Sequence, residues 1–271
     1  MTFDILICTI DNGISSVSQV LMPPMPGVRY VVSMQHTRPL ADVAEWGRAL
    51  TLLRERSDVT VLTLEGRGLS RNRNHALRAA TADILVIADD DCRYTPQTID
   101  CIRKAYAERP EADIICFEAE SYDGRPMKRY PASAMDYRTA QHHGYYPTSM
   151  ELTLRRTALA KSGVALNEHF GLGAELPAGE EEVWLCDMIR GGCSVEFVPK
   201  VITRSDPVTT GDNFLTDARL QVTKGAVFRH CYGVAESLWR TAKEGAYHLV
   251  YHHVNPLPIW LNMLRGVWNS Q

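Results

Sequence analysis

The chain alternates short, continuous apolar runs with segments in which apolar residues recur at helical spacing. A continuous apolar run bounded by polar residues is typical of a strand buried on both faces of a parallel sheet. Such runs predict strands over residues 3–10, 28–34, 59–64, 84–88, 114–117, 151–154 and 195–202. Helical spacing predicts helices over residues 43–53, 69–80, 95–106 and 180–190. The repeated strand–helix order predicts an α/β fold, with a mostly parallel sheet flanked by helices.

Two of the predicted helices begin at residues that are favoured as caps. Asp42 precedes the first helix, and Thr95 followed by Pro96 opens the third. Asp and Thr side chains accept hydrogen bonds from free N–H groups at a helix start, and proline is favoured in the first turn. Between residues 118 and 146 the periodicity fades, which predicts loops and short strands suited to a binding wall. Residues 212–249 are predicted to be mainly helical.

Three aspartates, Asp89, Asp90 and Asp91, directly follow the apolar run 84–88. Open α/β sheets bind ligands at the carboxyl ends of their strands. Because side chains alternate along a strand, Asp89 and Asp91 point to one side and Asp90 to the other. Two carboxylates at this spacing suit a hard divalent cation that carries phosphates. The alternative interpretation is a solvated acidic turn.

Composition narrows the class of protein. The 271 residues carry a formal net charge of −3 and a pI of about 6.3, so nucleic acid is not expected as a partner. The seven cysteines are scattered without a Cys-x-x-Cys pair, which argues against a zinc site and favours a reducing cytosol. No signal peptide is predicted, and no apolar run reaches the roughly 20 residues that a membrane span needs.

Two further motifs flank the acidic strand end. Gly68–Ala76 reads GLSRNRNHA, while Phe170–Gly173 and then Gly179–Leu185 read FGLG and GEEEVWL. Together with the strand that ends in Asp-x-Asp, they resemble family 2 glycosyltransferases of the GT-A fold. That family commonly has a Gly-x-Ser-x-x-Arg-Asn-x-Ala helix before the acidic strand and a Gly-Glu-Asp-x-x-Leu region after it. The resemblance covers roughly residues 3–225 and implies a Rossmann-like GT-A domain.

The resemblance implies roles for the aspartates. Asp91 would bind Mn²⁺ or Mg²⁺, and Asp89 would contact the ribose or a metal-bound water. Asp89 is therefore expected both in the nucleotide site and in the metal site. Asp90 is expected to support the nucleotide site. A divalent ion stabilises the charge that develops on a nucleotide diphosphate leaving group. Relatives often add a histidine ligand after the last strand, where this chain has Asp206. Aspartate is an acceptable ligand for these ions, although a turn cap would explain it equally well.

The acidic triplet at residues 180–182 supplies candidates for the general base. An acceptor hydroxyl needs a base as it attacks the sugar. The family's catalytic aspartate falls on Glu181, and Glu180 is the second candidate. Acidic residues at a helix start also stabilise the helix dipole, which is the alternative interpretation of the whole triplet.

Other residues are expected at the nucleotide. Thr9 and Asp11 match positions that line the nucleotide pocket in relatives. Gln35 follows the second strand and offers a donor and an acceptor, as a uracil edge requires, or it is an ordinary turn residue. Arg73, the arginine of the Arg-Asn pair, faces the diphosphate or forms an ion pair with the strand-end aspartates.

The C-terminal segment 255–271 has an apolar stripe at helical spacing, with tryptophans at positions 260 and 268. It suits either a helix docked on the core or a helix lying in a membrane interface. We expect a GT-A nucleotide-sugar-binding and catalytic domain over residues 1–211 and a helical extension over 212–271. The extension is the part expected to associate with a membrane or a partner.

The sequence as a whole predicts a metal-dependent, inverting glycosyltransferase of the hexosyltransferase type. It would move a sugar from a nucleotide-sugar, with UDP as the first choice, to a hydroxyl of a glycan or lipid-linked glycan. The expected setting is bacterial surface polysaccharide or glycolipid synthesis, in the cytoplasm at the inner face of the cell membrane. The alternative is a non-catalytic nucleotide-sugar-binding protein of the same fold.

Overall fold

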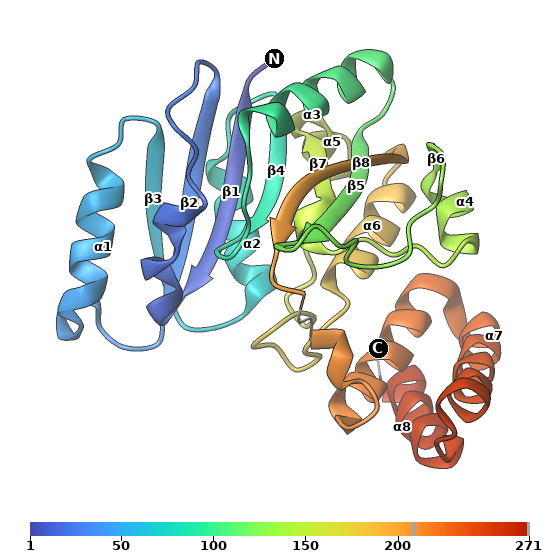
Figure 1. Cartoon of the computed structure of the whole chain (residues 1–271). Coiled ribbons are helices and arrows are strands. Elements are labelled where there is room, and N and C mark those ends of the chain that lie inside the picture. The colour runs from blue at the N-terminus through green and yellow to red at the C-terminus, as the bar shows by residue number, and fades with distance from the viewer. Residues whose placement is uncertain (208–209, 270–271) are drawn as a thin grey trace. The chain divides into compact units, whose positions relative to one another are not determined.

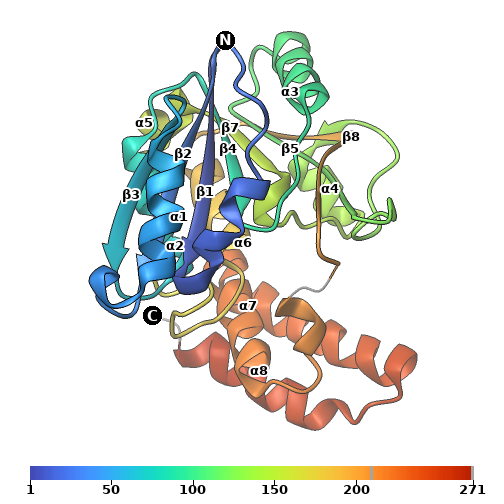
Figure 2. The ribbon, with the colours of Figure 1, turned by 60° about the vertical axis from the view of Figure 1, so that its left-hand side comes forward.

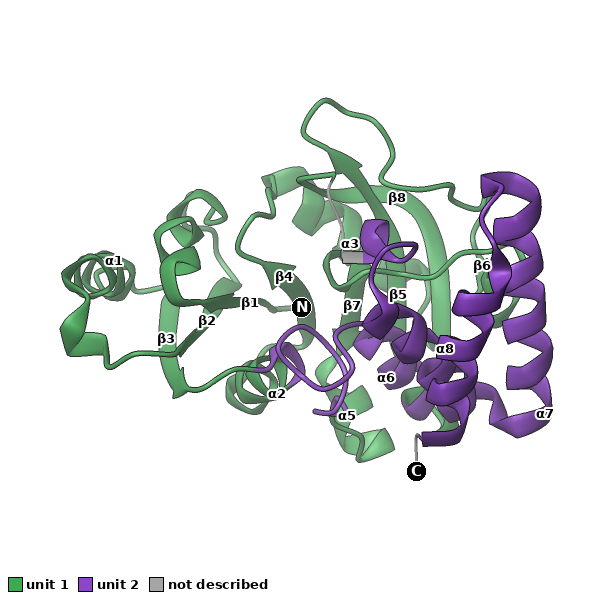
Figure 3. Cartoon of the chain, turned by 90° about the horizontal axis from the view of Figure 1, so that it is seen from below, with its two compact units in different colours: residues 1–67, 71–165, 188–207 green, residues 68–70, 166–187, 208–271 purple. Residues whose placement is uncertain are grey.

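The structure is a computed structural model that describes residues 1–207 and 210–269. The chain divides into two compact units, coloured separately in Figure 3. The first unit comprises residues 1–67, 71–165 and 188–207. The second comprises residues 68–70 and 166–187 together with the chain from residue 208 onward. The second unit therefore contains the glycine-rich loop, residues 170–179, as well as the C-terminal helices.

Within the described residues, the first unit holds an eight-stranded sheet in the order β3-β2-β1-β4-β7-β5-β8-β6. The strands are β1 (Phe3–Ile10), β2 (Val28–His36), β3 (Val59–Glu65), β4 (Ile84–Asp89), β5 (Ile114–Ser121), β6 (Met135–Asp136), β7 (Leu152–Arg155) and β8 (Val195–Ser205) (Figure 1). Strands β3, β2, β1 and β4 are parallel neighbours, as are β5 and β8. β7 lies antiparallel between β4 and β5, and β6 is antiparallel to β8. The predicted α/β fold with a mostly parallel sheet is confirmed.

Helices and short turns connect these strands. The helices of this part of the chain are α1 (Ala44–Arg54), α2 (Leu69–Ala79, whose first two residues belong to the second unit), α3 (Pro96–Glu108), α4 (Tyr137–His142) and α5 (Arg156–Ser162). The 3-10 turns are η1 (Asp11–Ser15), η2 (Val17–Gln19), η3 (Leu40–Asp42) and η4 (Ser149–Glu151). α1 lies beside β3, as Figure 1 and Figure 2 show.

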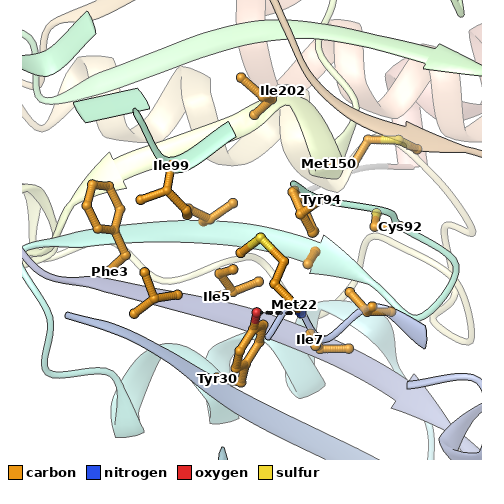
Figure 4. Packing of buried hydrophobic residues seen from close by; sticks show 14 of the residues in the cluster. Phe3, Ile5, Ile7, Met22, Tyr30, Cys92, Tyr94, Ile99, Met150 and Ile202 are labelled. Carbon is orange, nitrogen blue, oxygen red and sulfur yellow. Dashed lines mark hydrogen bonds between the residues drawn. The ribbon is translucent and has the colours of Figure 1, made fainter. Parts of the chain in front are cut away.

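The main core lies on the face of the sheet that α1 and α3 cover. Phe3, Ile5 and Ile7 of β1 point into it, because alternate residues of a strand share a face. Figure 4 shows these side chains packed with Ile99 of α3, and the Met22 N–H donating to the Tyr30 hydroxyl at 2.9 Å. Each fully buried aliphatic or aromatic side chain contributes about 1.5–3 kcal/mol. This packing holds β1 and β4 side by side and so determines where the residues after each strand lie.

One local expectation is wrong. Asp42 does not cap α1, because it lies in η3 and the cap position is Val43, without a side-chain hydrogen bond. The region predicted as loops and short strands contains the end of β5, which continues to Ser121, and the two-residue strand β6, together with the helix α4, which was not predicted. At the end of β5 the half-buried Glu118 and Glu120 alternate with buried neighbours, a strand pattern of period two. The predicted start of α3 is confirmed, with Pro96 as its first residue.

The described residues of the second unit form three main helices. They are α6 (Glu180–Arg190, whose last three residues belong to the first unit), α7 (Ala218–His252) and α8 (Pro256–Asn269), with the turn η5 (Thr210–Asn213) before α7. α7 is kinked at Gly233, whose φ of 76° interrupts the helical geometry. Its two halves are joined by an ion pair in which Lys224 Nζ lies 2.5 Å from Glu244 Oε1. The predicted mainly helical character of residues 212–249 is confirmed.

α8 packs on α7 through part of its apolar stripe. Ile259 and Met263 are buried in one cluster with Phe228 of α7. Gly225 of α7 lies so close to the backbone carbonyl of Met263 that a methyl group there would collide with it. This face therefore docks on the protein, as one of the two interpretations of the stripe requires. Among the described residues, no helix combines the length and apolarity that a membrane crossing demands.

Candidate active site

The three aspartates that end β4 form what we call the acidic edge, Asp89, Asp90 and Asp91. Each of them accepts a hydrogen bond from one hydroxyl group that comes from a distant part of the chain. The contacts are Ser149 Oγ to Asp89 Oδ2 (2.7 Å), Thr9 Oγ1 to Asp90 Oδ2, and Ser205 Oγ to Asp91 Oδ2 (2.9 Å). A hydroxyl donor holds a carboxylate in a fixed orientation and favours its charged form. All three carboxylates are thus oriented by the fold.

Strand topology explains how these hydroxyls reach the acidic edge. β1 pairs with β4 in parallel, with Cys8 opposite Asp89, so Thr9 falls next to Asp90. β7 runs antiparallel to β4, which brings the preceding turn η4, and Ser149 with it, to the carboxyl end of β4. Ser205 is the last residue of β8. Two strands, β1 and β8, and the turn before β7 therefore deliver hydroxyl groups to the end of β4.

Arg73 pairs with the acidic edge. Its side chain is 3% exposed, and its Nη2 lies 3.1 Å from Asp89 Oδ1. Of the two roles expected for Arg73, the ion pair with a strand-end aspartate is the one that the structure supports. The neighbouring Asn72 is also buried, and its Nδ2 donates to the carbonyls of Thr9 and Ser33 at 3.0 Å each. Arg73 and Asn72 thus tie α2 to the ends of β1, β2 and β4.

The acidic edge is electrostatically strained. Burial raises the pKa of Asp90, and the hydrogen bond from Thr9 only partly opposes that effect. Burial likewise raises the pKa of Asp91, and the charges of Asp89 and Asp206 raise it further. Asp206 itself is exposed. Crowded, partly desolvated carboxylates of this kind are stabilised by a cation.

The carboxylates of the acidic edge are candidate ligands for a metal ion. Among residues 1–207 and 210–269, no group of three or more His, Cys, Asp or Glu side chains is arranged to hold a metal. Asp89 already engages Arg73 and Ser149 through its two oxygens. Magnesium sites often use only one or two carboxylates, and substrate phosphates and water complete the coordination. The acidic edge fits that kind of site, and the ligand roles of Asp91, Asp89 and Asp206 stay predictions.

The residues expected at the nucleobase lie at the ends of β1 and β2. Gln35 is 2% exposed, and within the described part of the chain its Nε2 has no hydrogen-bond partner. A buried donor without a partner is costly and points to a ligand acceptor or ordered water. Asp11 has a structural contact instead, because its carboxylate accepts from the N–H and the hydroxyl of Thr37, at 2.8 Å each. Gln35 is therefore better suited than Asp11 to contact a base.

Gly13 is a site residue that the sequence analysis did not identify. It lies in η1, directly beside the contact between Thr9 and Asp90. A Cβ atom at this position would collide with Asp90 Oδ2 and with Thr9 Oγ1. Its backbone is not in the left-handed region, so the requirement for glycine is one of space. In the sequence, Gly13 belongs to an Asn-Gly pair after a strand, which is typical of an ordinary turn. No sequence pattern therefore indicated that it lies beside the acidic edge.

The acidic triplet of the second unit opens α6, as predicted. Glu180 is 5% exposed and lies under the glycine-rich loop. A Cβ at Gly171 would lie 3.1 Å from Glu180 Cδ, and Gly171 has a φ of 103°. Ser70 fixes the same loop by donating to the carbonyl of Phe170 at 2.6 Å. The loop thus packs against the buried Glu180.

Glu182 and Glu181 differ in their surroundings. Glu182 Oε1 accepts a hydrogen bond from the Tyr232 hydroxyl of α7 at 3.1 Å. Desolvation raises the pKa of Glu182, and the Tyr232 hydrogen bond and the charges of Lys224 and Arg240 oppose the rise. Glu181 is partly exposed. The three neighbouring carboxylates therefore have different surroundings. Glu180 is buried under the loop, Glu182 is hydrogen-bonded to α7, and Glu181 is partly exposed.

Residues 45–164 match the sequence model described as Glycosyl transferase family 2. This stretch is therefore similar to family 2 glycosyltransferases. It contains the Arg-Asn motif of α2 and the whole acidic edge, so the predicted resemblance to family 2 is confirmed. No curated protein sequence matches the chain.

Solved structures of TarS from S. aureus share the fold. TarS 1–349 aligns with a TM-score of 0.62 and 13% identity, over 99% of this chain and 81% of TarS 1–349. TarS 1–349 in complex with UDP-GlcNAc aligns with a TM-score of 0.65 and 14% identity, over 97% of this chain and 80% of the other. TarS 1–349 in complex with UDP aligns with a TM-score of 0.62 and 15% identity, over 94% of this chain and 74% of the other. The predicted GT-A-type fold is confirmed.

Proposed function

We propose that this protein is an inverting glycosyltransferase that moves a sugar from a UDP-linked donor to an acceptor hydroxyl. The observation that carries the proposal is the acidic edge, which lies inside the family 2 stretch and has each carboxylate oriented by its own hydroxyl. The UDP assignment is supported by Gln35, whose buried amide donor lacks a partner among the described residues. The TarS structures with UDP and UDP-GlcNAc share the fold and support the same donor class.

In this proposal Asp91 would hold Mn²⁺ or Mg²⁺, and Asp89 would contact the ribose or a metal-bound water. A bound divalent ion would neutralise charge on the diphosphate leaving group. The chain's own contribution is orientation, since Ser205 fixes Asp91 and Arg73 with Ser149 fixes Asp89. Asp206 adds negative charge near Asp91 and is proposed as a further ligand. Thr9 and Asp90 support the nucleotide site from the neighbouring strand end.

Glu181 is proposed as the base that removes the proton from the acceptor hydroxyl. Its partial exposure supports this role over that of Glu180, which the loop covers. Glu182 is held by Tyr232 and is the least suited of the three. Attack by the acceptor in one displacement inverts the anomeric centre. Glu180 remains the second candidate, since movement of the glycine-rich loop would uncover it.

The acceptor is proposed to be a glycan or lipid-linked glycan of bacterial surface polysaccharide or glycolipid synthesis. The cytoplasm is the proposed compartment, and the seven free cysteines support a reducing environment. Contact with the membrane would use the face of α8 that α7 does not cover. That face carries Leu257, Leu261 and Trp268, which is 63% exposed. Tryptophan favours the membrane interface, so sedimentation with phosphatidylcholine–phosphatidylglycerol vesicles and Trp268 fluorescence would test this contact.

Release of nucleotide diphosphate tests the central proposal. Purified protein with Mn²⁺ is incubated with UDP-, GDP- and dTDP-linked sugars, with and without candidate glycan acceptors. We expect release from a UDP-sugar, and loss of metal-dependent UDP binding in Asp91→Ala by calorimetry. Unchanged UDP binding in Asp91→Ala would remove this residue as a ligand. UDP-sugar binding without any turnover would favour the non-catalytic binding protein.

A further inference from the structure

The second unit contains a cavity of about 520 Å³ at the first half of α7. Its volume falls within the roughly 300–1,000 Å³ that is usual for small-molecule sites. Its lining includes Asn167, Phe170, Glu175, Arg229, His230 and Asn269. None of these residues belongs to the acidic edge or to the acidic triplet of α6. The cavity is therefore lined by residues other than those assigned to the donor.

Arg229 is the feature that points to a ligand. It is partly buried, and within residues 1–207 and 210–269 no carboxylate forms an ion pair with it. Two other arginines of α7 are paired, since Arg219 contacts Asp217 at 2.9 Å and Arg240 contacts Glu236 at 3.0 Å. A partly desolvated guanidinium without an anion is unfavourable. Its planar fork matches a phosphate or a carboxylate group, which would offset that cost.

His230 adds an oriented ring to the same wall. Its Nε2 lies 2.8 Å and 2.9 Å from the two carboxylate oxygens of Asp187 on α6. The carboxylate fixes the orientation and tautomer of the imidazole. Phe170 packs edge-on to this ring, with 6.2 Å between the ring centroids. The cavity thus has a rigid polar ring beside the cationic Arg229.

The rest of the lining suits hydroxyl groups. Asn167 and Asn269 contribute amide side chains, which both donate and accept hydrogen bonds. Glu175 is the acidic residue of the lining. Its side chain is 82% exposed, and its Oε2 lies 3.9 Å from His169 Nδ1. A carboxylate so well solvated contributes little to the potential deeper in the cavity. The cavity therefore combines a cation with groups that recognise hydroxyls.

We propose that this cavity binds a sugar unit that carries a phosphate or a carboxylate, with Arg229 on the anionic group. If the proposed glycosyl transfer is correct, this unit belongs to the acceptor, because the donor diphosphate is assigned to the acidic edge. That last step rests on the proposed function, whereas the binding of an anionic sugar does not.

Binding is measured by ligand-detected NMR with glucose 6-phosphate, glucuronate, inorganic phosphate and neutral glucose, without metal or nucleotide. We expect glucose 6-phosphate and glucuronate to bind at least about tenfold more tightly than glucose, and more tightly than inorganic phosphate. Arg229→Gln should lower the affinity for both anionic sugars about tenfold or more. Arg229→Lys, which keeps the charge and loses the fork, should give an intermediate affinity.

Arg219→Gln is the matched control, because Arg219 lies on the same helix and does not line the cavity. It should leave the affinity for the anionic sugars unchanged. Equal affinity for glucose and glucose 6-phosphate, or an unchanged affinity in Arg229→Gln, would overturn the proposal. Equal affinity for inorganic phosphate would show an adventitious ion only and would overturn it as well. UDP binding and UDP-sugar turnover of Arg229→Gln are measured separately, so a failed donor reaction is distinguishable from a failed anionic-sugar site.

Discussion

Ser205, the last residue of β8, donates a hydrogen bond to Asp91 across 114 residues of sequence, with 2.9 Å between Oγ and Oδ2. The carboxylate that is proposed to bind the metal is therefore positioned by a strand that does not neighbour β4 in the sheet. A hydrogen bond to a charged group contributes about 1.5–3 kcal/mol, enough to affect how a ligand binds. Orientation by distant hydroxyls is thus part of the proposed chemistry.

Ser205→Ala should weaken Mn²⁺-dependent UDP binding by roughly three- to tenfold, because Asp91 loses the donor that fixes it. Calorimetry with UDP at saturating Mn²⁺ measures the effect. Ser194→Ala is the matched control, since its hydroxyl contacts Asp113 at 3.2 Å, away from the acidic edge. It should alter stability without altering UDP affinity. Equal UDP affinities in the two variants would contradict the positioning role of Ser205.

Gly13→Ala should reduce UDP affinity at least about tenfold and lower stability by about 1–3 kcal/mol, because the new methyl group overlaps Asp90 and Thr9. Urea unfolding and calorimetry measure the two effects. Gly47→Ala is the control, as no atom lies within 4 Å of a Cβ at that helical position. That variant should bind UDP normally and gain up to about 1 kcal/mol of stability. Normal UDP binding by Gly13→Ala would contradict the prediction, because it would show that Asp90 and Thr9 can shift without loss of UDP affinity.

Glu181→Gln should leave UDP-sugar affinity nearly intact and reduce transfer by about a hundredfold or more, the usual scale for loss of a general base. Steady-state kinetics with the identified donor and acceptor measure it. The same measurement on Glu180→Gln and Glu182→Gln gives the comparison. A small effect at Glu181 together with a large one at either neighbour would move the base to that neighbour.

The stability of the protein should carry a pH dependence that comes from Glu182. Desolvation raises its pKa in the folded chain above the unfolded-state value near 4.5, so the folded state binds the proton more tightly. The contribution is fully present below pH 4.5 and is lost as the pH rises through the folded-state pKa. Urea unfolding at a series of pH values should therefore show wild type losing stability relative to Glu182→Gln as pH rises. The exposed Glu175→Gln is the control, and parallel curves for all three proteins would refute this origin.

Most of the sheet could be predicted because buried parallel strands are continuous apolar runs, and residues 84–88 are the clearest example. The Arg-Asn motif and the acidic edge were recognised because their residues are close in sequence. Ser149 and Ser205 were missed because no local pattern marks a hydroxyl whose partner lies 60 or 114 residues away. Only the pairing of strands brings such residues together.

Helix ends were less predictable than helices. Asp42 has the right chemistry for a cap, yet Pro39 and the turn η3 place it before the helix. The short helix α4 was missed because its six residues are too few to show a periodicity, although Asp136 caps it by accepting from the N–H of Arg138 at 2.8 Å. In both places a turn decided the outcome, and turns depend on few residues.

The hydroxyl groups on the acidic edge also bear on how the protein folds. They are supplied by β1, by the turn before β7 and by the end of β8, at separations of 81, 60 and 114 residues from their carboxylates. Contacts between residues so far apart in sequence require costly loop closure and slow folding. The edge is therefore expected to be complete only late on the folding pathway. A nucleotide bound there would stabilise the finished protein by slowing its unfolding, while leaving the rate of folding almost unchanged.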